Sequence, residues 1–265
     1  ALAGDAGKIY AGGSFSSIGS ASVRNLAHWD GNGWQAVGTS SNPLVETMLV
    51  QAGSVFIGGR FSAIGNVVVG RIARWNGSEW TALGTPAAPG VAPGSSVIRS
   101  LATTSDGRLV VVGSYQTAGG LRAGNVSLWD GTWRQIGAEG GEIVGDIRAI
   151  CVTASDVYVA GSLTQAAGIP VNSIARWNGS RWSALGSGVA SSFYVSGYVF
   201  ALACDDDSLY VAGNFDIAGG APARRVARWD GSAWHHMDIG LGSADPRDSE
   251  FVFALLILHG GDNAA

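Results

Sequence analysis

Clustered histidines and carboxylates are the first candidates for a functional site. His235 and His236, followed by Asp238, have the residue types that a metal site uses. Adjacent side chains of a strand point to opposite faces, so these two imidazoles cannot share one ion, and we expect solvated strand histidines. The run Asp205-Asp206-Asp207 offers carboxylate oxygens, which calcium prefers. Other repeats of the chain hold a polar turn at this point, so we expect a hairpin turn and predict neither a metal site nor a cofactor.

Two loops carry the residues that we consider for ligand binding. Phe193, Tyr194 and Tyr198 place three aromatic side chains close together, and Asp245 and Arg247 place charges in a later loop. Variable loops on a fixed scaffold often carry binding residues. We predict a ligand surface at these positions. Packing of the aromatic residues against the last repeat, and simple solvation of the charged ones, are the alternatives.

No catalytic arrangement can be read from the sequence. It contains no Gly-x-Ser-x-Gly elbow, no Cys–His arrangement and no phosphate-binding loop. Paired carboxylates that hydrolyse glycosides could still be brought together by the fold. We therefore predict a protein that is not an enzyme and has no catalytic residues, with a glycoside hydrolase as the least favoured alternative.

Composition restricts both the class of protein and its partners. Hydrophobic residues make up 46% of the 265 positions and charged residues 14%, and there are 41 glycines. These values fit a globular chain with many tight turns rather than a disordered one. A net charge of −4 argues against nucleic-acid binding, which needs a clustered basic face. No apolar run reaches the length of about 18 residues that a membrane span needs.

A stretch of nine residues recurs along the chain and reveals its organisation. Ile174 to Trp182 reads as a strand, a turn at Asn-Gly and a second strand, and four similar copies exist. All ten tryptophans fall in these copies, two in each: Trp29 and Trp34, Trp75 and Trp80, Trp129 and Trp133, Trp177 and Trp182, Trp229 and Trp234. The Asp-Gly or Asn-Gly pair between them predicts a type I′ hairpin turn. We assign the tryptophans a structural role, packing between repeats.

The repeats predict the fold. The first tryptophan of each pair recurs at intervals of 46, 54, 48 and 52 residues, a period typical of propellers. Each repeat has four short apolar segments separated by glycine-rich turns, and four antiparallel strands make one blade. We predict an all-β fold, a single β-propeller domain over residues 1–265 with five four-stranded blades. The repeats span about 1–44, 45–97, 98–146, 147–197 and 198–249.

The end of the chain bears on how the ring would close. Residues 251–256 are similar to the opening of the fifth repeat, residues 198–203. We predict a closing strand over residues 250–258, which takes the place of the loose segment 1–3 because a propeller cannot leave an apolar edge open. A sixth blade, or a fragment of a longer propeller, is the alternative.

Two further residue types occupy repeated positions. Cys151 and Cys204 lie on the first strands of adjacent repeats, and we expect two buried free thiols, with a disulfide across the blades as the alternative. Arg74, Arg176 and Arg228 recur at one position of the repeat. We expect them to pair with a backbone carbonyl or to stack on tryptophan.

A known family is similar to this pattern. The order of an apolar strand, Gly-Gly, a further strand and Trp resembles the kelch-type blades of the galactose oxidase propeller, most clearly at Leu209–Phe215, Ala218-Gly219-Gly220 and Val226–Trp234. It also resembles repeats of secreted bacterial proteins and is similar to the extracellular region of the fungal cortical cell-polarity marker family. The resemblance implies a secreted or cell-surface propeller with no shared activity.

The functional prediction is correspondingly broad. We expect a non-enzymatic, extracellular or cell-surface module for protein interaction or structure, part of a larger assembly or a longer chain. Its partner would be a protein or a surface glycan. A carbohydrate-binding propeller is the alternative, and it requires pockets with aromatic and polar walls that repeat between blades.

Overall fold

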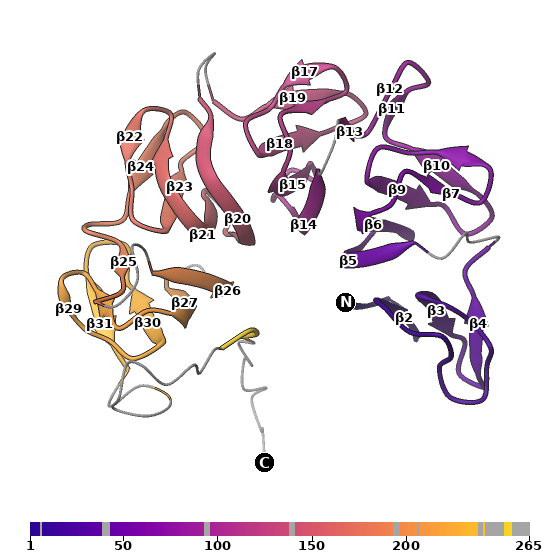
Figure 1. The fold of residues 1–265 in the computed structure, drawn as a ribbon, viewed down its shortest axis with the longest axis horizontal. Helices are drawn as coiled ribbons and strands as arrows, with labels where there is room; N and C mark the ends of the chain where they lie inside the picture. Colours follow the sequence, from indigo (N-terminus) through magenta and orange to yellow (C-terminus); the bar gives the residue numbers. More distant parts are fainter. Residues whose placement is uncertain are drawn as a thin grey trace. The chain divides into compact units, whose positions relative to one another are not determined.

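All regular structure in the described residues is β-structure. The computed structural model describes residues 1–5, 7–38, 43–92, 96–137, 141–192, 197–205, 207–237, 241 and 252–255. These described residues form strands and turns and contain no helix (Figure 1). The contacts divide the chain into two compact units, residues 1–147 and 148–265. The predicted all-β class is confirmed.

The first three repeats each form one four-stranded antiparallel sheet in unit 1. The first sheet consists of β1 (Leu2–Asp5), β2 (Lys8–Gly12), β3 (Leu26–Trp29) and β4 (Trp34–Ala36). The second consists of β5 (Leu44–Gln51), β6 (Ser54–Arg60), β9 (Ile72–Trp75) and β10 (Trp80–Ala82). The third consists of β14 (Val97–Thr103), β15 (Leu109–Ser114), β18 (Val126–Trp129) and β19 (Trp133–Gln135).

The fourth and fifth repeats continue the same strand order. The fourth sheet consists of β20 (Ile143–Val152), β21 (Val157–Ala166), β23 (Ile174–Trp177) and β24 (Trp182–Ala184), and β22 (Ile169–Pro170) also pairs with β21. The fifth consists of β26 (Tyr198–Cys204), β27 (Leu209–Asn214), β30 (Val226–Trp229) and β31 (Trp234–His236). In every sheet the two tryptophan-bearing strands are neighbours, and the first strand is the opposite edge.

Short strands lie outside these five sheets. In unit 1 they are β7 (Ala63–Ile64), β8 (Val67–Val68), β11 (Gly84–Thr85), β12 (Ala88–Pro89), β13 (Val91–Ala92), β16 (Thr117–Ala118) and β17 (Leu121–Arg122). In unit 2 they are β25 (Val189–Ala190), β28 (Ile217–Ala218) and β29 (Ala221–Pro222). β13 pairs with β16, and β25 pairs with β28. Two of the segments between repeats, which the sequence presents as variable loops, therefore bond to the hairpin of the next repeat.

The turn between each pair of tryptophans differs from the prediction. Trp29 pairs directly with Trp34, so four residues form the loop, and Asp30 does not have the positive φ that a type I′ turn requires. Instead Asp30 Oδ1 accepts hydrogen bonds from the backbone N–H groups of Asn32 and Gly33, both at 2.9 Å. The predicted turn type was wrong because the Asp or Asn side chain, which forms an Asx turn, closes the loop.

A single glycine near the end of the second strand is required by a close approach of two strands. A Cβ on Gly213 would lie 1.9 Å from the carbonyl oxygen of Tyr198, so only glycine fits there. The register of β26 on β27 shifts between Val199 and Ala201, a β-bulge that leaves Phe200 as the extra residue. Second and third sheets have the same shift. The glycine is thus required by the bulge in the first strand.

The residue before the third strand of each sheet has a left-handed backbone, which the sequence did not reveal. These residues are Asn25, Arg71, Asn125, Ser173 and Arg225, with φ between 63° and 74°. Each backbone N–H donates to a carbonyl at the end of the second strand, and each carbonyl accepts from a glycine. Two backbone hydrogen bonds per repeat stabilise this uncommon conformation.

Buried aliphatic and aromatic side chains fill the space between sheets within each unit. In three repeats the second tryptophan of the pair reaches the preceding repeat: the indole N–H of Trp80 donates to the Val37 carbonyl at 3.3 Å, that of Trp133 to the Leu83 carbonyl at 2.8 Å, and that of Trp234 to the Leu185 carbonyl at 2.7 Å. These side chains are at least partly buried, so each tryptophan joins apolar packing to a hydrogen bond between repeats.

The two ends of the chain depart from the predicted closure. β1 pairs with β2 from Leu2↔Ala11 to Asp5↔Lys8, so the N-terminal segment is itself the edge strand of its sheet. Of the expected closing strand 250–258, the described residues 252–255 have no strand structure. Phe253 instead contacts Phe200, with ring centroids 5.0 Å apart. The remaining residues of that segment lie outside the described ranges.

Candidate functional site

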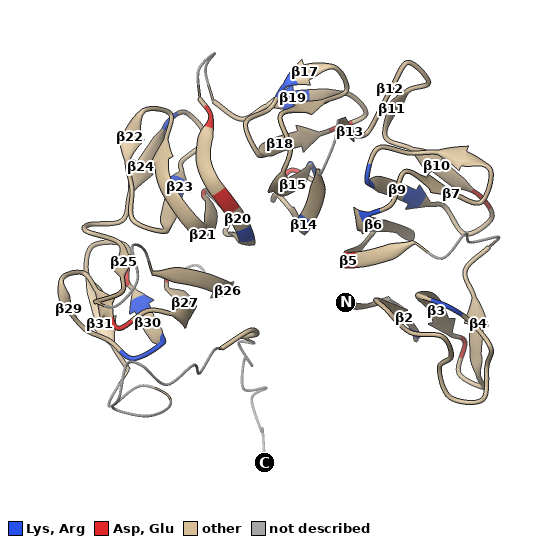
Figure 2. Ribbon diagram, viewed as in Figure 1, with Lys and Arg blue, Asp and Glu red and all other residues tan. Residues whose placement is uncertain are grey.

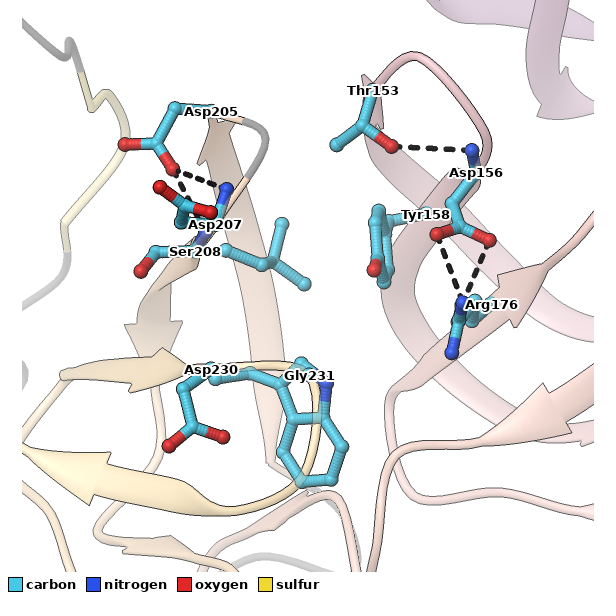
Figure 3. Close-up of a pocket in the computed structure, with 11 residues that line it drawn as sticks. Thr153, Asp156, Tyr158, Arg176, Asp205, Asp207, Ser208, Asp230 and Gly231 are labelled. Carbon is cyan, nitrogen blue, oxygen red and sulfur yellow. Dashed lines mark hydrogen bonds and ion pairs between the residues drawn. The ribbon is translucent and has the colours of Figure 1, made fainter.

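Unit 2 contains a pocket between its fourth and fifth sheets. The acidic pocket, as we name it, is lined by Thr153, Asp156, Tyr158, Arg176, Asp205, Asp207, Ser208, Leu209, Trp229, Asp230 and Gly231, and its volume is about 270 Å³. Figure 3 shows Asp205, Asp207 and Asp230 across the opening from Asp156 and Tyr158. Charged side chains are sparse over both units (Figure 2). Four carboxylates and one guanidinium around one cavity are therefore a concentration of charge.

Arg176 and Asp156 form one wall of the acidic pocket. Arg176 Nε donates to Asp156 Oδ1 at 2.8 Å, and its Nη2 donates to Oδ2 at 2.9 Å (Figure 3). The Asp156 side chain is only 8% exposed, so this bidentate pair satisfies a buried carboxylate. Asp156 also raises the pKa of Arg176 through these hydrogen bonds. The one cation of the pocket is thus already neutralised.

The opposite wall is built from two turns closed by carboxylates. Asp205 Oδ1 accepts from the N–H groups of Asp207 and Ser208 at 3.0 and 2.8 Å. Asp230 Oδ1 accepts from the N–H of Ala233 at 2.8 Å, and these hydrogen bonds hold the pKa of Asp230 well below its usual range. Both turns therefore hold their carboxylates in fixed positions, and Asp230 is firmly ionised at neutral pH.

A disulfide joins the two walls of the acidic pocket. Cys151 on β20 and Cys204 on β26 are bonded, with Cα atoms 6.1 Å apart. Free thiols were the wrong expectation, because the first strands of adjacent repeats bring the two side chains together. Cys151 precedes Thr153 by two positions and Cys204 directly precedes Asp205, so the covalent bond fixes the distance between the two acidic loops.

Unit 1 contains an equivalent pocket between its second and third sheets. The balanced pocket, as we name it, is lined by Gln51, Ala52, Ser54, Phe56, Arg74, Asp106, Gly107, Arg108, Leu109, Trp129, Asp130 and Gly131, and its volume is about 330 Å³. Its positions correspond along the repeat, because Arg74 pairs with Phe56 across the sheet as Arg176 pairs with Tyr158. Two arginines face two aspartates here, so the formal charges cancel.

The recurrent arginines bind side chains rather than carbonyls or tryptophan. Arg74 Nε donates to Ser54 Oγ at 3.0 Å, and its guanidinium lies 6.0 Å from the Phe56 ring centroid. Arg228 Nη1 donates to Ser208 Oγ at 3.4 Å. The partner is always 20 residues earlier, at the first residue of the second strand or directly before it. The expected structural role holds in outline, but the partner is a hydroxyl or a carboxylate.

Of the residues predicted to bind a ligand, the described ranges include only Tyr198. Its ring lies 5.3 Å from that of Phe200, and the Arg148 guanidinium lies 5.2 Å from the Tyr198 ring centroid. This cluster belongs to β20 and β26 and does not line the acidic pocket. Phe193, Tyr194, Asp245 and Arg247 lie outside the described residues.

The histidine and aspartate clusters form local pairs. His235 Nε2 lies 2.5 Å from Asp230 Oδ2, and His236 is exposed on the same strand. Within the described ranges, no three His, Cys, Asp or Glu side chains come together as metal ligands would. None of the described segments is a helix long and apolar enough for a membrane crossing. Asp206 and Asp238 lie outside the described residues.

Sequence reasoning missed the acidic pocket as a site. Asp205 and Arg176 were noted and explained locally, while Asp156 and Tyr158 were not singled out. The available signal was the position at the start of the second strand, which holds Ser54, Arg108, Asp156 and Ser208 in the second to fifth repeats. A carboxylate there, facing a neighbouring repeat with further carboxylates, marks one interface as different from the others.

Comparison with known proteins gives a likeness of fold. No protein-family model matches the chain, and no curated protein is similar to it in sequence. Among solved structures, it is similar to the extracellular domain of the putative hybrid two-component system BT4673 from B. thetaiotaomicron, with a TM-score of 0.52 and 10% identity over 87% of this chain and 27% of that one. A second similar structure is YCF48 bound to D1 peptide, with a TM-score of 0.46 and 17% identity over 81% of this chain and 61% of that one. The chain thus spans about a quarter of the first protein's length and less than two thirds of the second's.

Proposed function

We propose that this chain is a non-enzymatic β-propeller that binds a protein partner. In this proposal the five four-stranded sheets are the blades of a closed, kelch-like ring. Support comes from the common strand order of the five sheets and from the likeness of fold to a solved extracellular domain over 87% of the chain. An experimental structure with an open ring, or with six blades, would contradict the five-bladed arrangement.

The observation that carries the binding function is the pair of equivalent pockets at corresponding positions of the repeat. Pockets with a few fixed polar groups and aromatic walls are typical ligand sites. Three of their carboxylates, those of Asp106, Asp130 and Asp230, are poorly suited to acid catalysis, which needs a pKa raised toward neutrality. Hydrogen bonds from Arg108 and Thr104 lower the pKa of Asp106 to about 2, and the pKa values of Asp130 and Asp230 are also lowered. These groups favour recognition of charge over proton transfer.

We also propose an extracellular or cell-surface location. The Cys151–Cys204 disulfide supports it, because structural disulfides persist in oxidising compartments. The protein of similar fold from B. thetaiotaomicron is itself an extracellular domain by its description. A chain that is reduced at both cysteines when isolated from its native cells would contradict this location.

Carbohydrate binding is the second candidate. Two equivalent pockets with aromatic and polar walls are what this alternative requires, and Trp129 and Trp229 occupy the same place in each. The pockets differ in charge, however, and neutral sugars would not need that difference. Protein binding therefore remains the favoured function.

An array experiment separates these functions. The fluorescently labelled intact chain is applied to immobilised 12-residue peptides of varied charge and to a glycan array. Binding to a defined subset of peptides is the expected result. Binding to glycans alone would favour the second candidate, and turnover of chromogenic glycosides would contradict the non-enzymatic assignment.

A further inference from the structure

We propose that the acidic pocket takes the cationic side chain of a lysine or arginine from an extended segment of the protein partner. This inference rests on the proposed protein-binding function and names the chemistry that the partner must present. It follows from the charge, the aromatic walls and the rigidity of the pocket, and from the contrast with the balanced pocket.

Among the described residues, the carboxylates of Asp205, Asp207 and Asp230 in the acidic pocket have no Lys or Arg partner. Arg176 is engaged with both oxygens of Asp156. Within the described part of the chain, no Lys or Arg side chain pairs with Asp205 or Asp207, and Asp230 has only the imidazole of His235 beside it. Three carboxylates therefore remain around a cavity of about 270 Å³. An incoming ammonium or guanidinium would gain their attraction without displacing an existing cation.

The aromatic walls fit the same ligand. Tyr158 and Trp229 both line the pocket, and their side chains are largely buried. Cations bind over aromatic faces, most strongly over tryptophan. Burial raises the pKa of Tyr158, so its phenol stays neutral and does not compete as an anion. Aromatic rings suit a sugar as well as a cation, so it is the carboxylates without a Lys or Arg partner that favour a cationic side chain.

Trp229 also has an unused hydrogen-bond donor. This residue is 8% exposed, and among the described residues its indole Nε1 has no acceptor. Buried donors are almost always paired in proteins, but this Nε1 is itself shielded from solvent, so a ligand acceptor could reach it only if the side chain shifted on binding. A peptide segment offers a backbone carbonyl next to its cationic side chain. One extended segment could therefore satisfy both needs.

The balanced pocket shows that the negative charge does not come with the repeat. There Ser54 replaces Asp156, and Arg108 replaces Ser208 and pairs with Asp106 at 2.7 Å. The two pockets share their fold position and their tryptophan but differ in charge. The balanced pocket is thus a control within the same molecule.

Binding is tested with capped nine-residue Gly-Ser peptides that carry one central Arg, Lys or citrulline. Citrulline keeps the shape of arginine and removes its charge. The readout is the indole N–H resonance of Trp229 in the intact, oxidised chain, titrated with each peptide. We expect the Arg and Lys peptides to shift this resonance with a dissociation constant about fivefold or more below that of the citrulline peptide, and to lose affinity at high salt.

Two conservative variants and a matched control assign the effect to this pocket. Asp207→Asn and Asp230→Asn remove charge, and Asn76 and Asn178 show that Asn closes the same turn as Asp230. Each should weaken binding about two- to fivefold, and the double variant about tenfold. Asp130→Asn, the equivalent change in the balanced pocket, should leave the affinity unchanged.

The outcomes separate this inference from the proposed function. Equal binding of the citrulline peptide, insensitivity to the Asp variants, or competition by a neutral oligosaccharide at the Trp229 resonance would overturn the inference. If peptides bind but shift only resonances outside the pocket, protein binding stands and this inference falls. If no peptide on the array or in solution binds at all, the protein-binding function falls with it.

Discussion

Arg176 binds Asp156 through two parallel hydrogen bonds of 2.8 and 2.9 Å, and the carboxylate is almost fully buried while the guanidinium is 36% exposed. In the second repeat the same position pairs Arg74 with Ser54. One change from Ser to Asp therefore converts a neutral contact into an ion pair. Because Arg176 is bound to Asp156, it does not neutralise the other carboxylates of the acidic pocket.

Because the carboxylate of this pair is buried and the guanidinium is partly exposed, removing one side chain should destabilise the chain more than removing the other. Arg176→Ala leaves a buried carboxylate without its partner and should lower the free energy of unfolding by about 3 kcal/mol. Asp156→Ser restores the contact seen between Arg74 and Ser54 and should cost about 1 kcal/mol. Urea denaturation followed by tryptophan fluorescence measures both. Equal losses of unfolding free energy in the two variants would show that the buried Asp156 carboxylate does not need Arg176 as its partner.

The bulge in the first strand predicts an intolerant glycine. Gly213→Ala places a Cβ against the Tyr198 carbonyl oxygen and should destabilise the chain by about 2–3 kcal/mol. Gly231→Ala is the matched control: its φ is 93° and nothing lies near its Cβ, so only the backbone conformation is penalised, by about 1 kcal/mol. The melting temperature of Gly213→Ala should be the lower of the two. A lower melting temperature for Gly231→Ala would contradict the close approach of Gly213 to the Tyr198 carbonyl oxygen.

The disulfide predicts a redox-dependent stability. Its cysteines are separated by 53 residues in the sequence, and the chain-entropy model gives about 4 kcal/mol for a loop of that size. The double variant Cys151→Ser, Cys204→Ser should unfold at a correspondingly lower urea concentration and become insensitive to reducing agent. A native chain whose unfolding does not respond to reductant would contradict a structural disulfide.

Lowered carboxylate pKa values predict a loss of stability in acid. The pKa of Asp106 falls to about 2 because Arg108 and Thr104 bind its carboxylate, against about 3.9 in an unfolded chain. The folded-state pKa is depressed, so the contribution is complete above about pH 4 and lost as the pH falls toward about 2. Asp106→Asn should flatten the pH dependence of unfolding in this range. An unchanged slope would mean that the Arg108 contact does not persist in solution.

Regular repetition explains how much of the fold the sequence could predict. The paired tryptophans recur at each repeat and Gly-Gly recurs in four of the five, so strand order and sheet number follow from local patterns. The Asx turns did not follow, because Asp-Gly fits both a two-residue turn and a longer loop closed by its own side chain. Neither did the left-handed residues such as Arg71 and Arg225, whose side chains give no hint of positive φ.

The candidate site was harder to predict because its walls belong to different repeats. Asp156 and Arg176 are 20 residues apart, and Asp205 and Asp230 come from the next repeat. Each has a sufficient local explanation, as a turn or a pair. Only the packing of adjacent sheets, fixed by Cys151–Cys204, shows that their charges add up around one cavity.

The most direct test of the account transfers the acidic character to the balanced pocket. Ser54→Asp, Arg108→Ser and Arg134→His copy Asp156, Ser208 and His235 into unit 1. Because Arg134 otherwise pairs with Asp130, all three changes are needed to leave Arg74 as the one arginine beside three carboxylates. Titration with the Arg peptide is then followed at the indole N–H resonances of Trp129 and Trp229. We expect the Trp229 resonance to shift in both proteins and the Trp129 resonance to shift only in the variant. A variant that folds, yet whose Trp129 resonance stays unchanged while Trp229 shifts, would contradict the claim that pocket charge decides binding.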